Sequence, residues 1–146
     1  MKVQRSIEIA TPPGKIWPFL VLPSNILKWV TTFQKCEFSS QQHGGVGTTL
    51  YVEEKTGGPF MKINFVVTEW MENQKLAFKM TSGNFIKGYE QQWMLEAIPS
   101  GSRFNFIEDV IMPWGILGRL IGLLGRSSSE KHVKEALNNL KSLAEA

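Results

Sequence analysis

The sequence predicts an α+β fold, in which a curved antiparallel sheet of about seven strands is combined with two short helices and a long C-terminal helix. Three observations lead to this prediction. Apolar and polar residues alternate along most of residues 1–112, which is the period of half-buried strands. The turns between these segments are short, so neighbouring strands must be antiparallel. Residues 130–146 instead repeat their apolar positions with a helical period.

The N-terminal part predicts one strand and two short helices. Residues 3–9 alternate as a strand does. Thr11 is suited to cap a helix and Pro12 to occupy its first position. Pro18 falls inside this helix and should bend or shorten it, because proline removes a backbone hydrogen bond. A second short helix is expected over 23–29.

The middle of the chain predicts six further strands, each ending in a turn. Their boundaries are marked by Gly, Pro, Asn and Ser clusters. The expected strands are 32–42, 48–55, 60–71, 75–82, 86–98 and 101–112.

The C-terminal helix has two contrasting halves. Residues 130–146 are amphipathic, as expected of a helix packed on a sheet. Residues 114–125 are apolar almost all round and include four glycines. Because a glycine costs a helix about 1 kcal/mol relative to alanine, this half should be the weaker one. A flexible lid, a broken helix and a loop are all compatible with the 113–126 segment.

Length and composition limit the function classes. A chain of 146 residues predicts one domain, 1–146. The excess of 16 Lys and Arg over 13 Asp and Glu is too small and too scattered to predict nucleic-acid binding. One cysteine excludes an internal disulfide, and neither a signal peptide nor a membrane-spanning run is present. We therefore expect a cytoplasmic protein; the sequence does not determine its oligomeric state.

Aromatic and methionine side chains are numerous, with nine Phe, five Trp and six Met. Such side chains supply the adaptable apolar surface that lines a ligand cavity. The alternative is an ordinary core with no cavity. The residues expected to line a cavity are Trp29, Phe33, Phe65, Phe78, Met80, Trp93, Phe106, Trp114, Leu117 and Leu120.

Polar residues in phase with the apolar face of a strand are the candidates for chemistry. Arg5 alternates in phase with the apolar residues of the first strand, and Glu108 with those of the last. Buried opposite charges persist only when paired, so an inward Arg5–Glu108 pair is one expectation and a slip that exposes either residue is the other. Tyr89 and Gln91 share the phase of Trp93 and are candidates to hydrogen-bond a ligand.

No metal site or cofactor motif is predicted. His43 lies in a predicted turn and His132 on the polar side of the terminal helix, so both are expected at the surface. Neither is spaced with Cys36 as metal ligands would be. Nothing resembles a nucleophile elbow or a phosphate-binding loop.

The order of elements and several short segments resemble the START/Bet v 1-like superfamily, in particular its polyketide cyclase/dehydrase-like branch. The resemblance covers the whole chain and implies a helix-grip fold that encloses a cavity for lipids, sterols or polyketides. Pro18 and the glycines of 115–125 depart from the pattern. The segments that carry it are Ser6–Ile9 followed by Pro12–Trp17, then Gly45–Thr48, Val67–Glu69 with Lys75-Leu76, Gln92–Leu95 and Leu137–Lys141.

Three functional hypotheses follow. The leading one is binding of a small apolar or amphipathic ligand between sheet and helix. The second is a cyclase or dehydratase, with Glu108 or Tyr89 as acid or base and Arg5 stabilising an enolate-like oxygen. The third is an interaction module, in which Trp114, Arg119 and Arg126 bring the apolar 113–126 segment to a membrane surface or a partner.

Overall fold

The computed structural model describes residues 1–146 and contains one seven-stranded antiparallel sheet with strand order β1-β7-β6-β5-β4-β3-β2. The predicted fold class is confirmed. The elements are β1 (Lys2–Ile9), α1 (Pro13–Val21), α2 (Pro23–Trp29), β2 (Phe33–Phe38), β3 (Thr49–Glu54), β4 (Met61–Met71), β5 (Lys75–Gly83), β6 (Gly88–Ile98), β7 (Gly101–Ile111) and α3 (Gly115–Glu145).

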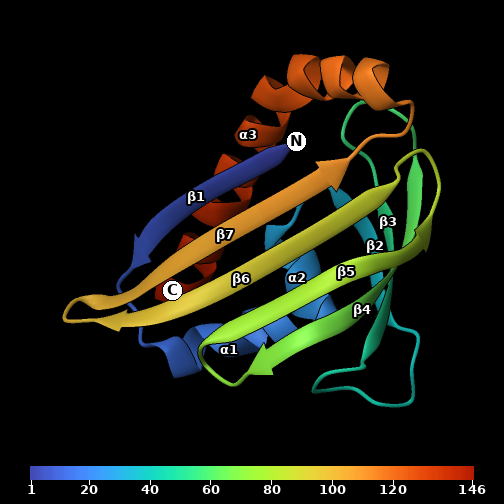
Figure 1. The fold of residues 1–146 in the computed structure, drawn as a ribbon. Coiled ribbons are helices and arrows are strands. Elements are labelled where there is room, and N and C mark those ends of the chain that lie inside the picture. Colours follow the sequence, from blue (N-terminus) through green and yellow to red (C-terminus); the bar gives the residue numbers. More distant parts are fainter.

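The first and last strands lie side by side. Strand β1 pairs with β7, so that Val3 is opposite Glu108 and Arg5 is opposite Phe106. The sheet curls from β1 to β2, and the three helices lie on one face of it (Figure 1). Helix α3 packs along β1 and against α2. This arrangement places β3 and β7 on facing parts of the curved sheet.

The start of α1 differs from the expected cap. The helix begins at Pro13, and its N-cap residue Pro12 has no side chain to accept a hydrogen bond. The Thr11 hydroxyl instead donates to the Ala144 carbonyl of α3, at 2.9 Å. The predicted capping role of Thr11 is therefore wrong, because this hydroxyl ties the end of β1 to the end of the chain. Pro18 lies inside a helix of only nine residues, as its effect on helix length predicts.

Aromatic side chains form the centre of the core. Trp29 and Trp93 are fully buried, and their ring centroids lie 4.9 Å apart in an edge-on arrangement. Phe78 packs edge-on against Trp93 at the same distance, 4.9 Å. Edge-on contacts of this kind add stability beyond the burial of apolar area. These rings pack together beneath one part of the sheet.

The glycine-rich segment is helical. Helix α3 runs from Gly115 to Glu145, and Figure 1 shows that it bends between its orange N-terminal part and its red C-terminal part. Gly118 and Gly122 are buried. A β-carbon on Gly118 would collide with the Pro113 carbonyl oxygen, whereas one on Gly122 would only touch Met1 and Met112. The glycines therefore allow the helix to approach the end of β7 closely.

Most of the large apolar side chains of the same segment point away from the protein. The exposed fraction is 86% for Leu124 and 78% for Ile116. The remaining members of this outer row are Leu117, Leu120 and Leu123. None of the three helices combines the length and the hydropathy that crossing a bilayer requires.

Candidate functional site

A cavity of about 400 Å³ lies between the curved sheet and α3. Half of the 26 residues that line it are hydrophobic, which is typical of a site for a small organic molecule. Strands β3, β6 and β7 form its floor, and the glycine side of α3 forms its roof. Three loops meet at one end, and they contribute Pro59, Phe85 and Trp114.

A chain of hydrogen bonds leads from the core to a carboxylate in the cavity. The Trp93 indole donates to Gln91 Oε1 at 2.8 Å. Gln91 Nε2 donates to the Tyr89 hydroxyl at 2.9 Å and to Glu108 Oε1 at 3.2 Å. The Tyr89 hydroxyl donates to the same Oε1 at 2.6 Å. Tyr89 and Gln91 thus both donate to Glu108 Oε1, and these two hydrogen bonds hold the carboxylate in position.

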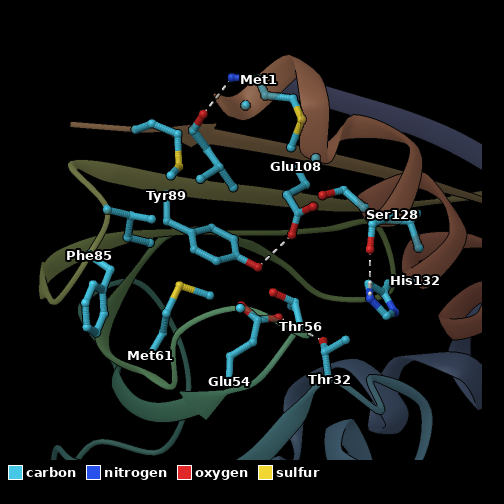
Figure 2. Close-up of a pocket in the computed structure, with 18 of the residues that line it drawn as sticks. Met1, Thr32, Glu54, Thr56, Met61, Phe85, Tyr89, Glu108, Ser128 and His132 are labelled. Carbon is cyan, nitrogen blue, oxygen red and sulfur yellow. Dashed lines mark hydrogen bonds between the residues drawn. The ribbon is translucent and has the colours of Figure 1, made fainter. Parts of the chain in front are cut away.

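A second carboxylate, Glu54, enters the cavity from β3. Figure 2 shows Glu54 and Thr56 on the side of the cavity opposite Glu108. Glu54 is only 4% exposed, and its Oε2 accepts a hydrogen bond of 2.8 Å from the Thr32 hydroxyl. Burial, followed by the negative charge of Glu108, raises the pKa of Glu54 to about 7, although hydrogen bonding from Thr32 and Tyr89 opposes this.

Glu108 has a raised pKa as well. Burial raises it, and the hydrogen bonds from Tyr89 and Gln91 act in the opposite direction. The side chain is half-buried, because the surface that it exposes faces the cavity rather than the outside of the protein. Two nearby carboxylates resist ionising together, and the negative charge of Glu108 is one of the causes that raise the pKa of Glu54.

Helix α3 adds hydroxyl groups and a histidine to the roof. His132 and Ser128 line the cavity, and His132 Nε2 lies 3.4 Å from the Ser128 hydroxyl oxygen (Figure 2). The expectation that His132 lies on the solvated surface is therefore wrong. His43 is exposed in its loop, where its ring stacks on Phe38.

The cavity includes some of the residues expected to line it. Tyr89, Gln91, Phe106, Glu108 and Trp114 do line it. The others do not. Five pack in the aromatic core beside the cavity, namely Trp29, Phe33, Phe65, Phe78 and Trp93.

Three further residues of that expected lining lie elsewhere. Met80 packs against the core from its edge. Leu117 and Leu120 point outward from α3. Placing Leu117 and Leu120 in the lining is wrong because the glycine side of α3, rather than its leucine side, faces the sheet.

The expected pair of Arg5 and Glu108 is not formed. Arg5 is exposed, and Glu108 takes part in no ion pair. In the β1–β7 register Val3, not Arg5, stands opposite Glu108. From the edge strand β1, the long Arg5 side chain reaches water. No group of three or more His, Cys, Asp or Glu side chains is placed to hold a metal ion.

The comparisons with known proteins establish the family. Residues 1–145 match the family described as polyketide cyclase / dehydrase and lipid transport, and the chain belongs to it. The expected membership of the polyketide cyclase/dehydrase-like branch is thereby confirmed. An uncharacterized protein of Mycobacterium tuberculosis, Rv2574, is 24% identical over 70% of this chain. The chain spans 61% of the length of the curated relatives it matches.

Solved structures share the fold at low sequence identity. Protein TTHA0849 of Thermus thermophilus has a TM-score of 0.83 and 16% identity, covering 99% of this chain and 97% of its own. The START superfamily protein of Mycobacterium smegmatis has a TM-score of 0.78 and 15% identity, with 97% and 98% covered. The Zhui aromatase/cyclase of Streptomyces sp. R1128 has a TM-score of 0.81 and 11% identity, with 99% and 93% covered.

Proposed function

We propose that the protein binds a small hydrophobic or amphipathic ligand, such as a lipid, a sterol or a polyketide-like molecule, in the cavity between its sheet and α3. The observation that carries this proposal is the cavity of about 400 Å³ beside a core that is otherwise filled by packed aromatic rings. Cavities of roughly 300–1,000 Å³ are the size that small organic ligands occupy. The polar groups gathered around Glu108 would fix the orientation of the ligand. A cytoplasmic location, to be tested by cell fractionation, is part of the same proposal.

Binding is tested with Nile red, a neutral apolar dye whose fluorescence rises in an apolar site. We expect a dissociation constant below about 10 μM, or roughly 7 kcal/mol of binding free energy. Ser129 lines the cavity and Ser127 does not, although both lie on α3. Ser129→Phe should therefore reduce binding at least about tenfold and Ser127→Phe should not. Equal binding by both variants would place the dye elsewhere.

A cyclase or dehydratase is the second candidate function. It is favoured by the two carboxylates of the cavity, because the pKa of Glu54 is about 7 and a general acid works best near the ambient pH. The Zhui aromatase/cyclase has the same fold. In this mechanism Glu54 would donate a proton and Glu108 would accept one, while Arg5 has no role. Turnover of a poly-β-keto thioester that Glu108→Gln abolishes, without loss of binding, would support catalysis.

Contact with a membrane surface is also favoured by one observation, the outer apolar row of α3. Leu124 is 86% exposed, and Arg119 on the same segment would be drawn to anionic head groups. Sedimentation with vesicles of phosphatidylcholine and phosphatidylglycerol tests this contact. Leu124→Gln should reduce the bound fraction, whereas Leu22→Gln, at an exposed leucine on another face, should not.

A further inference from the structure

The charges that line the cavity differ in sign from those of the chain as a whole. The chain has 16 Lys and Arg residues, yet none of them is among the 26 residues that line the cavity. The two acidic residues of the lining, Glu54 and Glu108, enter from facing strands (Figure 2). A buried carboxylate is costly unless a proton or a cation compensates its charge.

Neither carboxylate has a cationic partner within the protein. The seven ion pairs of the structure include neither of them. Thr32 is bonded to Glu54 Oε2, and both donors to Glu108 reach its Oε1. Glu54 Oε1 and Glu108 Oε2 are not acceptors in these hydrogen bonds, although the Tyr89 hydroxyl lies close enough to Glu54 to lower the pKa of its carboxyl. Two acceptor atoms on opposite sides of the cavity are thus left for a ligand.

The other titratable groups of the cavity do not compensate these charges. The nitrogen His132 Nε2 is directed at Ser128. The N-terminal ammonium of Met1 donates to the Val110 carbonyl and lies 3.6 Å from Asp109 Oδ1. The Tyr89 hydroxyl already donates its proton to Glu108, and burial together with the charge of Glu108 raises the pKa of Tyr89 further.

We propose that the ligand of this cavity is a cationic amphiphile, whose protonated amine lies between Glu54 and Glu108 and whose apolar part lies against the β6–β7 floor and α3. This inference rests on the proposed binding function and adds the chemical class of the ligand. An ammonium group carries only donors and a carboxylate only acceptors, so the two are complementary. A metal ion fits less well, because the cavity supplies only two carboxylates and its walls are largely apolar.

The test compares decylamine, decanol and decanoate, which share an alkyl chain and differ in head-group charge. Each compound is titrated against bound Nile red at pH 8, below the concentration at which it forms micelles. We expect decylamine to bind about tenfold more tightly than decanol, and decanoate to bind most weakly. Glu54→Gln and Glu108→Gln should each weaken decylamine binding about tenfold and change decanol binding by less than about twofold. Glu90→Gln, at an exposed position on β6, is the control.

A second measurement on the unmodified protein guards against loss of folding in the variants. An alkylamine stays protonated between pH 6 and pH 8, as lysine does. Because Glu54 ionises in that range, decylamine affinity should rise with pH and decanol affinity should not. Equal affinities for the three compounds, or a preference for decanoate, would overturn the cationic ligand and leave apolar binding standing. Displacement of the dye by none of them would overturn both proposals.

Discussion

The Tyr89 hydroxyl donates a hydrogen bond of 2.6 Å to Glu108 Oε1 on the neighbouring strand. Tyr89 is 3% exposed, so this hydrogen bond is made by a buried residue. Gln91 supports both residues and is held in turn by the Trp93 indole. One end of the chain of donors is thus anchored in the aromatic core, and the other positions a carboxylate in the cavity.

Removing this donor should cost stability. Hydrogen bonds to charged groups contribute about 1.5–3 kcal/mol, so we expect Tyr89→Phe to lower the free energy of unfolding by roughly that amount in urea denaturation. Tyr51 offers a matched control, because its hydroxyl donates to Glu53 at 3.1 Å near the surface. Tyr51→Phe should cost clearly less, because an exposed polar contact contributes little to stability. Equal losses of unfolding free energy in the two variants would contradict a larger contribution from the buried hydrogen bond.

The stability of the protein should depend on pH through Glu54. The pKa of this group is 4.5 when unperturbed and about 7 in the folded protein. The folded state therefore holds a proton that the unfolded chain has already released. The free energy of unfolding should fall as the pH rises from 4.5 to 7, by at most roughly 3 kcal/mol, and level off above that.

Glu54→Gln isolates this effect from the other carboxylates. The variant cannot ionise at this position, so its stability relative to the unmodified protein should increase over the same pH interval. Denaturant unfolding at a series of pH values measures that difference. A constant difference across the series would show that Glu54 ionises normally in the folded protein.

The fold was predictable from the sequence because strand and helix periods are local signals. Residues 60–71 and 75–82 were expected as strands, and β4 and β5 match them within one residue. The expected strand 32–42 ends instead at Phe38. The chain then enters an exposed loop, in which Ser40 and Gln42 hydrogen-bond nearby backbone atoms. Polar side chains of this kind terminate strands in ways that alternation alone does not reveal.

The candidate site was predictable only in part, because it depends on which of several apolar faces meet. Strand phase placed Tyr89, Gln91 and Glu108 inward, and all three line the cavity. Glu54 was overlooked, although it follows Leu50 and Val52 in phase, and an acidic residue on such a face is a usable signal. His132 was missed because helical phase placed it on the polar side of α3, and phase alone does not show that this side faces the cavity.

The glycines of α3 should differ in their tolerance of a methyl group. At Gly118 a β-carbon would collide with the Pro113 carbonyl oxygen, whereas at Gly125 nothing lies within 4 Å. Gly125→Ala should stabilise the helix by up to about 1 kcal/mol. Gly118→Ala should destabilise the protein by about 1–3 kcal/mol, because backbone must move. Thermal unfolding of both variants gives the comparison, and two stabilising substitutions would contradict the close approach of α3 to residue 113.

The two halves of α3 should differ in how readily their backbone hydrogen bonds open. The half at 133–143 buries Val133, Leu137 and Leu140, so its amides open only with much of the core. The half at 115–125 contains four glycines and buries only two of them, so local opening should cost less free energy. We expect faster hydrogen exchange at 115–125 than at 133–143.

Because Ile121 and Gly122 line the cavity, a bound ligand should slow exchange in the first half selectively. Ligand-independent and equal protection of both halves would show that α3 is one rigid element and does not gate the cavity.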